Sequence, residues 1–343
     1  MTHSISSAAF ASATLLALSG IGLSGHLQQS ERIAFGDLLN GTAQTAYEAG
    51  FDGANAASAF AVDAVGALKL ALFGQSSDGA VLGKDGWIFT SEEFESAETF
   101  DANIIVSAER VARAVSALTR KGITVLPVVI PDKSDVYVDE LEFVRPSAVE
   151  RRLDQFRMAL SVRDVAFLDA RPTLKQAAQI GDVFVKDDTH WSPPGSRKVA
   201  EAIASNLAHL DYSRAAVNTT QGPSVAYDGD LLSFVPTGRW RSLIGPEQFA
   251  IETFKTEVDT QGDLFDAPGV EIALVGTSFS ARAAFHFEGF LKQALQADIL
   301  NFAQEGQGPF APMDAFLASE FLKSTPPKVV IWEIPVRYVS KDL

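Results

Sequence analysis

Apolar runs of strand length alternate with helical segments from residue 102 to the end of the chain. The clearest example is the run at 123–130 (ITVLPVVI), which follows a segment of helical period at 102–121 that stops at Gly122. A continuous apolar run is typical of a strand buried on both faces, and its alternation with helices is typical of a parallel sheet covered on both sides. We therefore predict an α/β fold with a central, mostly parallel sheet flanked by helices.

The same rules predict the other elements of this alternation. Further strands are expected at 165–168, 270–275, 299–302 and 329–334, and further helices at 147–160, 193–210, 287–297 and 313–323. Asp85 and Gly86 predict a tight turn before a short aromatic strand. Residues 213–265 are polar and glycine-rich without a clear period, so we expect an insertion of loops and short strands there.

The N-terminal segment has the composition of an export signal. Residues 8–23 are apolar and small, no acidic residue precedes Glu31, and no Lys or Arg precedes Arg32. Such a run is typical of the hydrophobic region of a signal peptide or of a weak membrane anchor, although the usual basic residues before it are missing. We expect residues 1–28 to be a signal peptide or an N-terminal anchor, residues 31–74 to form one or two helices, and residues 29–343 to form a single domain.

The overall composition argues against several classes of protein. The formal net charge is −15, whereas proteins that bind nucleic acids or anionic membranes generally carry a surplus of Lys and Arg. The chain has no cysteine, so disulfides and thiolate metal sites are excluded.

Ser278 follows the predicted strand at 270–275 and precedes a helix. A serine at the carboxyl end of a parallel strand lies at the edge where α/β sheets bind ligands, and nearby backbone N–H groups can stabilise an oxyanion. Gly276 would let a substrate approach the hydroxyl closely. The same Gly-Thr-Ser segment is also typical of a helix N-cap, so by itself it leaves both interpretations open.

Asp188 and His190 form the second candidate pair. A serine hydroxyl is a weak nucleophile until a base, usually an imidazole oriented by a carboxylate, removes its proton. The two residues are two positions apart in a predicted loop, where their side chains can point the same way. Two alternatives remain: the pair could bind a metal ion, or Asp188 could cap the next helix. Since the sequence has no second histidine nearby and no carboxylate cluster beyond the Asp187–Asp188 pair, we expect neither a metal nor another cofactor.

Several motifs together resemble one family. The segments Asp-Thr-His-Trp and Gly-Thr-Ser-Phe-Ser are similar to the paired signatures of the alginate O-acetyltransferase family (AlgJ/AlgX-like), whose domain is related to the SGNH hydrolases. These and further matching segments occur at 188–191, 276–280, 83–95, 130–137, 229–236, 287–309 and 326–338. The resemblance implies an SGNH hydrolase-like three-layer fold.

The resemblance also implies an activity. Ser278 would be the nucleophile, His190 the general base and acid, and Asp188 the residue that orients His190. The implied reaction is acetylation of a secreted exopolysaccharide, alginate or similar, in the periplasm. The acetyl donor would be a membrane-bound acyltransferase, and other exopolysaccharide biosynthesis proteins would be partners. Two alternatives stay open: a carbohydrate acetyl esterase and a non-catalytic polysaccharide-binding assembly subunit.

Other residues of the family-like motifs are candidates for substrate contact. The oxyanion would be bound by the backbone N–H of Ser278 or its neighbours, with Arg282 as a helper. The residues that could line a sugar cleft are Trp87, Lys133, Tyr137, Trp191 and Arg337. Each has an ordinary alternative, because aromatic side chains are often part of the core and a Lys or Arg can pair with a carboxylate or cap a strand end.

Overall fold

The computed structural model describes residues 66, 70, 76–235, 237–259 and 270–342. The chain divides into two compact units, Met1–Ser77 with Val235–Gly245 and Asp78–Phe234 with Pro246–Leu343. The predicted signal or anchor at 1–28 lies outside the described residues, as do the predicted helices at 31–74 apart from residues 66 and 70, which are helical. Within the described residues no helix combines the length and apolarity needed to cross a membrane.

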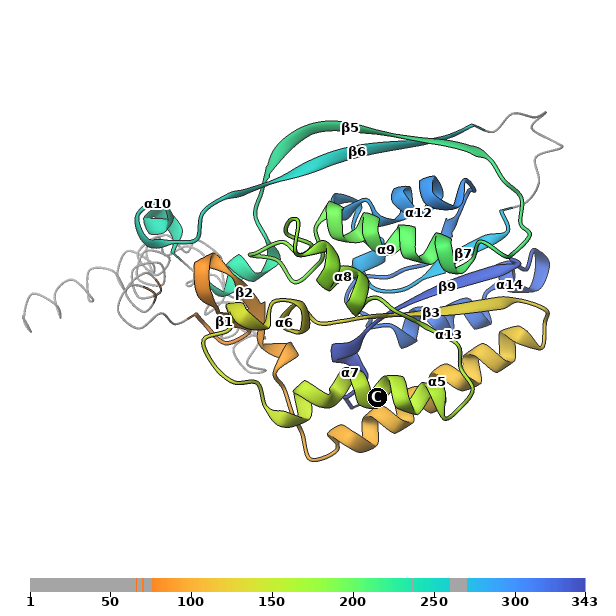
Figure 1. The fold of residues 1–343 in the computed structure, drawn as a ribbon, viewed down its shortest axis with the longest axis horizontal. Helices are drawn as coiled ribbons and strands as arrows, with labels where there is room; N and C mark the ends of the chain where they lie inside the picture. The colour runs from red at the N-terminus through yellow and green to blue at the C-terminus, as the bar shows by residue number, and fades with distance from the viewer. Residues whose placement is uncertain (1–65, 67–69, 71–75, 236, 260–269, 343) are drawn as a thin grey trace, which may run out of the picture. The chain divides into compact units, whose positions relative to one another are not determined.

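A five-stranded parallel sheet forms the centre of the larger unit (Figure 1). Its strand order is β4-β3-β9-β7-β8. The strands are β3 (Thr124–Ile130), β4 (Leu168–Asp169), β7 (Ile272–Val275), β8 (Leu300–Asn301) and β9 (Val329–Pro335). Because all neighbours are parallel, their carboxyl ends meet at one edge of the sheet. The predicted α/β fold with a mostly parallel sheet is therefore confirmed.

Helices cover both faces of this sheet (Figure 1). One face packs against α8 (Arg171–Ala177), α9 (Pro193–Asn206) and α12 (Phe287–Leu295). The other packs against α5 (Phe100–Thr119), α7 (Ser147–Ser161), α13 (Phe310–Ala318) and α14 (Glu320–Ser324). Central strand β9 serves both cores, since Ile331 packs in the first and Trp332 in the second. This is why its sequence is apolar on both faces up to Glu333 rather than alternating.

Some element boundaries differ from those expected. The single helix predicted at 313–323 is two helices, because Ser319 is extended and its side chain accepts a hydrogen bond from Leu322 N–H at the start of α14 (3.2 Å). The predicted strand at 165–168 is reduced to β4, and α9 ends at Asn206 rather than near residue 210. Helix α8 was not predicted.

The segment at 213–265 contains longer strands than expected. Strands β5 (Ala216–Tyr227) and β6 (Phe249–Asp259) form an antiparallel ribbon with an irregularity between Gln221 and Ser224. The ribbon runs across α9 and α12 (Figure 1). Most of β5 is exposed, so its residues show no alternation of polar and apolar types from which a strand could be predicted.

Short elements complete the described chain. The predicted turn at Asp85 and Gly86 is present, since both have positive φ and lie in η1 between strands β1 and β2. These elements are β1 (Ala80–Leu82), η1 (Lys84–Gly86), β2 (Ile88–Thr90), η2 (Ser91–Glu93), α6 (Lys133–Val136), η3 (Val138–Glu140), η4 (Asp230–Phe234), α11 (Ser278–Ala281), η6 (Ala283–Phe285) and η7 (Val336–Tyr338). In the smaller unit, η5 (Gly238–Trp240) precedes α10 (Arg241–Ile244).

Candidate active site

Ser278 and the Asp188–His190 pair meet at the carboxyl edge of the sheet. Ser278 is the first residue of α11, and two residues separate it from the end of β7. Asp188 and His190 lie in the loop between α8 and α9. The structure thus brings together two segments that are 88 residues apart in the chain.

Neither segment uses these side chains as helix caps. Thr277 caps α11, because its hydroxyl accepts the N–H of Phe279 (3.3 Å). Ser192 caps α9 in the same way and accepts the N–H of Gly195 (3.3 Å). The side chains of Ser278 and Asp188 are therefore free for other interactions.

A continuous hydrogen-bond chain joins the three residues. Asp188 Oδ1 lies 2.6 Å from His190 Nδ1, and His190 Nε2 lies 2.7 Å from Ser278 Oγ. A neutral imidazole with its proton on Nδ1 donates to the carboxylate and accepts from the serine hydroxyl, which is the tautomer that a general base needs. All three side chains are largely buried, and Ser278 retains 8% exposure. This arrangement can move a proton from Ser278 to His190.

Asp188 is held ionised by several donors. Its Oδ1 also accepts the N–H of His190 (2.8 Å), and its Oδ2 accepts the hydroxyl of Tyr227 (2.8 Å) and the N–H of Asp230 (3.0 Å). Burial by itself would raise the pKa of Asp188, but the hydrogen bonds and the charge of His190 outweigh it and hold the pKa well below its usual range. A carboxylate that stays charged can orient an imidazole and stabilise it when it becomes protonated.

Aromatic side chains fix the plane of the imidazole. The ring of His190 stacks on Phe285 at 5.2 Å and lies 4.7 Å from the ring of Phe279. Phe279 directly follows Ser278, and Phe285 lies in η6. The segment that carries the nucleophile therefore also positions the base.

The metal alternative can be compared with this geometry. Among the described residues, one group of potential ligands is formed by Asp188, His190 and Asp230, whose ligand atoms lie within 4.8 Å of one another. The 2.6 Å contact between Asp188 Oδ1 and His190 Nδ1 is a hydrogen-bond distance, whereas each atom would lie about 2.0–2.2 Å from a shared zinc ion on separate sides. The other imidazole nitrogen faces Ser278. The observed geometry thus favours proton transfer over metal binding.

A buried lysine anchors the loop that carries Asp188. Lys133 is the first residue of α6, after the carboxyl end of β3, and is 1% exposed. Its Nζ donates to the carbonyl oxygens of Val185 (3.0 Å), Lys186 (3.2 Å) and Asp188 (2.6 Å). Burial lowers the pKa of Lys133 to about 8, against the attraction of nearby carboxylates.

A buried glutamate anchors the turn that carries Ser278. Glu333 on β9 is fully buried, and its Oε2 accepts the N–H of Thr277 (2.7 Å) and the hydroxyls of Thr277 (3.0 Å) and Ser280 (3.1 Å). A Cβ atom on Gly276 would lie 2.5 Å from Glu333 Oε2. The absence of a side chain at Gly276 therefore makes room for the Glu333 carboxylate. The expectation that it also lets a substrate approach Ser278 stays a prediction. Burial raises the pKa of Glu333 to about 7, against the hydrogen bonds that it accepts.

Four of the predicted cleft residues have protein partners. Trp87 is buried and lies 3.9 Å from the ring of Tyr137, whose hydroxyl accepts the N–H of Val183 (2.8 Å). Trp191 is buried and donates to the carbonyl of Phe279 (3.1 Å). Like Lys133, these side chains support the catalytic loops from beneath, so their contact with a sugar stays a prediction that the geometry does not favour.

Arg337 is also buried. Its guanidinium lies over the ring of Phe279 at 5.3 Å, and its Nε lies 3.3 Å from Glu92 Oε2. Its side chain is 4% exposed, so it contributes to the packing below Ser278 rather than to an open surface. The prediction that it contacts substrate is likewise not favoured.

Arg282 is the predicted contact residue that reaches the edge of the site. Its side chain is 30% exposed, and Nη1 lies 3.8 Å from Asp188 Oδ2 and 3.5 Å from Asp230 Oδ2. Its Nε lies 3.0 Å from Glu305 Oε2. Arg282 is thus a cation beside the hydrogen-bond chain with part of its surface open to a ligand.

The sequence prediction missed three residues of this site. Tyr227, Asp230 and Glu333 each make direct hydrogen bonds to the catalytic segments. Asp230 and Glu333 belong to motifs that carried the family resemblance, so a signal was present without an assigned role. Tyr227 lies at the end of β5, and its contact with Asp188 depends on the path of the ribbon.

Comparison with known proteins places the chain in a family. The family model described as "SGNH hydrolase-like domain, acetyltransferase AlgX" matches residues 80–336. The chain is 35% identical over 318 residues to the probable alginate O-acetylase AlgJ of Pseudomonas aeruginosa, covering 88% of this chain and 81% of the relative. It is 32% identical over 334 residues to AlgJ of Pseudomonas putida, covering 95% and 87%.

Solved structures agree with this assignment. The O-acetyltransferase domain of Pseudomonas putida AlgJ has a TM-score of 0.71 and 31% identity, covering 77% of this chain and 93% of that domain. Pseudomonas aeruginosa AlgX has a TM-score of 0.59 and 23% identity, covering 77% of this chain and 63% of that one, and supports the fold alone. The chain therefore belongs to the AlgX-type family of SGNH hydrolase-like acetyltransferases.

Proposed function

We propose that this chain transfers an acetyl group through Ser278 onto hydroxyls of alginate or a similar exopolysaccharide. The observation that carries the proposal is the unbroken hydrogen-bond chain from Asp188 through His190 to Ser278. The names of the AlgJ relatives, which are probable alginate O-acetylases, support the choice of acceptor.

In the first half of the reaction, Ser278 Oγ attacks the carbonyl carbon of the donor's acetyl group. His190 Nε2 takes the hydroxyl proton, and the charge of Asp188 stabilises the resulting imidazolium. The backbone N–H of Ser278 donates to no other described residue and is available to the oxyanion, with Arg282 nearby. When the intermediate collapses, the proton of His190 goes to the leaving group, and an acetyl-serine remains.

In the second half, a sugar hydroxyl replaces the donor. His190 Nε2 removes the proton of this hydroxyl as its oxygen attacks the acetyl carbon, and the same proton then returns to Ser278 Oγ as the serine leaves. The acceptor gains an O-acetyl group, and the protein regains its starting state.

The cellular setting follows from the same proposal. The donor would be a membrane-bound acyltransferase, and the reaction would take place in the periplasm with other alginate biosynthesis proteins. The AlgJ and AlgX relatives support a link to that system. The N-terminal segment would serve as the export signal or as a tether to the inner membrane.

The test of the nucleophile is acetylation of the protein itself. We expect the parent protein to gain one acetyl group on Ser278 when it is incubated with 4-nitrophenyl acetate, as measured by mass spectrometry. Ser278→Ala removes the attacking oxygen, so acetyl transfer should fall on the order of 10⁴-fold or more. Ser324→Ala, at the exposed end of α14, is the matched control. Acetylation that persists in Ser278→Ala would refute the proposal.

A second measurement separates transfer from hydrolysis. An esterase and a transferase share the acetyl-serine and differ in whether water or a sugar hydroxyl attacks it. We expect oligomannuronate to speed the loss of acetyl from Ser278 and to appear as acetylated product. Loss of acetyl at the same rate with and without acceptor would identify an esterase instead. A serine that no acetyl donor or phosphonate labels would point to a binding subunit.

A further inference from the structure

Away from the hydrogen-bond chain of the active site, a surface pocket, or hollow, lies between α9, α12 and the ribbon of β5 and β6. Its volume is about 480 Å³, within the range of sites for small ligands. We call it the Arg197 hollow, after the one arginine in its wall. Its wall also includes Asn218, Phe254, Phe290 and Gln293.

Arg197 has the geometry of a site for a carboxylate. Its guanidinium lies over the rings of Phe254 and Phe290, at 4.7 and 4.5 Å from their centroids. Within the described chain no carboxylate lies within 4 Å of it, and the acid in the same wall, Glu201, is paired with Lys198 (2.8 Å). Two rings hold the plane of the guanidinium while its N–H groups have no acidic partner. A planar guanidinium held in this way is suited to bidentate binding of a carboxylate.

Amide side chains add partners for hydroxyl groups. Asn218 and Gln221 project from the exposed strand β5, and Gln293 comes from α12. The Oε1 atom of Gln293 is buried and has no hydrogen-bond partner. The amide groups of Asn218 and Gln221 are exposed and can donate to or accept from ligand hydroxyls. A carboxylate and hydroxyl groups on one small ring are the chemistry of a uronic acid.

The Arg197 hollow borders a smaller hollow that reaches the edge of the active site. Thr219, in its wall, lies 2.7 Å from Thr256 Oγ1, which in turn lies 2.7 Å from His286 Nε2. Thr256 and His286 line a smaller hollow of about 240 Å³, whose wall also contains Arg282. Arg282 Nη1 lies 3.8 Å from Asp188 Oδ2. The two neighbouring hollows therefore mark a path over the surface from Arg197 toward the Asp188–His190–Ser278 hydrogen-bond chain.

We propose that the Arg197 hollow binds a uronate residue of the acceptor polymer while a hydroxyl elsewhere on the same chain reaches Ser278. The inference rests on the proposed function for the identity of the polymer. It gives a protein of net charge −15 a local cation for a polyanion, because Arg197 has no acidic partner among the described residues.

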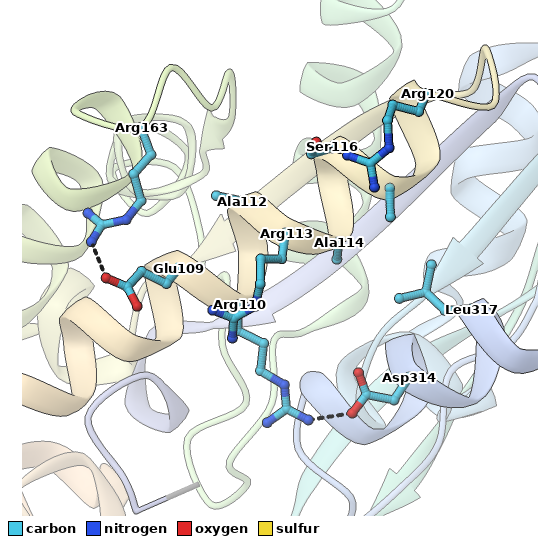
Figure 2. A pocket seen from close by; sticks show the side chains of 11 residues that line it. Glu109, Arg110, Ala112, Arg113, Ala114, Ser116, Arg120, Arg163, Asp314 and Leu317 are labelled. Atoms are coloured by element: carbon cyan, nitrogen blue, oxygen red, sulfur yellow. Dashed lines mark hydrogen bonds and ion pairs between the residues drawn. The ribbon is translucent and has the colours of Figure 1, made fainter.

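A larger hollow on the opposite side of the sheet provides the contrast. It has a volume of about 920 Å³ and lies between α5 and α13, lined by four arginines (Figure 2). Two of them already have acidic partners, Arg110 with Asp314 and Arg163 with Glu109. Arg113 is exposed on α5 in this hollow, so Arg113→Gln makes the same change of charge away from the proposed path.

Direct binding tests the inference without acetyl chemistry. Full-length Ser278→Ala protein is titrated with oligomannuronate by calorimetry, with and without Arg197→Gln. We expect Arg197→Gln to weaken binding about ten- to a hundredfold, because a charge-assisted bidentate pair is lost. Arg113→Gln should leave the affinity unchanged. Unchanged binding in Arg197→Gln, or an equal loss in Arg113→Gln, would overturn the proposal.

A second variant guards against misfolding of the first. Asn218 is exposed on β5, and Asn218→Ala should weaken binding about three- to tenfold through the loss of one amide. A neutral oligosaccharide such as cellohexaose should bind the Arg197→Gln protein and its parent equally weakly. Equal effects of Arg197→Gln on both sugars would overturn the carboxylate assignment. Because these proteins lack Ser278, the result is independent of whether the parent forms an acetyl-serine.

Discussion

The two catalytic segments are held from below by anchors of opposite charge. The loop that carries Asp188 presents backbone carbonyl oxygens to the interior, and the cation Lys133 binds three of them. The turn that carries Ser278 presents N–H and hydroxyl donors, and the anion Glu333 binds these. Each anchor therefore matches the kind of polar group that its segment turns inward.

The difference follows from the local backbone. In the loop before α9, backbone N–H groups reach the carbonyl oxygens of Val185 and Lys186, whereas the buried carbonyl oxygen of Asp188 is bonded by Lys133 Nζ. The strand-to-helix turn at Thr277 has N–H groups that the start of a helix leaves without intrahelical partners, so these donors need an acceptor from another element. Burial disfavours the charge of both anchors, since it lowers the pKa of Lys133 and raises that of Glu333. Desolvation of Lys133 and Glu333 is unfavourable, but leaving the buried polar groups that they bind without partners would be more unfavourable still.

Of the changes to the two anchors, removal of the Lys133 cation should have the largest effect on stability and on the reactivity of Ser278. Lys133→Met removes three charge-assisted hydrogen bonds and leaves the buried carbonyl oxygen of Asp188 without a donor, so we expect the free energy of unfolding to fall by about 3 kcal/mol. The rate at which a phosphonate labels Ser278 in the folded protein should fall at least about tenfold. Urea denaturation and labelling at low temperature measure the two effects.

The matched control is Lys186→Met in the same loop. The Nζ of Lys186 makes one exposed hydrogen bond, to the carbonyl of Asp85 (3.3 Å). Its replacement should change stability by less than about 0.5 kcal/mol. If both variants lose the same stability, Lys133 is not the anchor of the loop.

Replacement of the anion should change the pH dependence of stability. The pKa of Glu333 is raised from 4.5 to about 7, so the folded state binds the proton more tightly than the unfolded state between these values. The free energy of unfolding of the parent therefore falls as the pH rises through this window, by up to about 3 kcal/mol from this group. Glu333→Gln has no such proton, and its stability relative to the parent should increase between about pH 5 and pH 8.

Urea denaturation of both proteins across this window measures the difference. Asp132, whose pKa is also raised to about 7 by burial, contributes equally to both proteins and cancels. If the stability of the parent and of Glu333→Gln changes with pH in the same way, the pKa of Glu333 is not raised in the folded protein.

The smallest effect is expected at the ribbon. Tyr227→Phe removes one of the two hydrogen bonds to Asp188 Oδ2 and leaves the one from Asp230. We expect a loss of about 1 kcal/mol in stability and a fall in acetyl transfer of about threefold to tenfold. Tyr212→Phe is the control, because its hydroxyl lies 3.5 Å from its acceptor. A larger effect from Tyr227→Phe than from Lys133→Met would mean that the ribbon, not the lysine, holds the loop.

Much of the sheet was predictable because its strands are buried on both faces. The runs at 123–130 and 329–334 are mostly apolar, with Glu333 as the charged exception in the second, and the structure has β3 and β9 there. The ribbon was not predicted as long strands, since most of β5 is exposed and carries no periodic signal. The break at Ser319 depends on one capping hydrogen bond within an otherwise helical pattern.

The sequence by itself determined the types of residue that could do the chemistry. Asp188, His190 and Ser278 could be selected because a serine nucleophile requires a base and an orienting acid. The tertiary structure decided that His190 lies 2.6 Å from Asp188 and 2.7 Å from Ser278. These distances require the turn after β7 and the loop between α8 and α9 to meet at one edge of the sheet. The tertiary structure also decided that Lys133 and Glu333 face inward as anchors, since burial and partners depend on contacts between segments far apart in the chain.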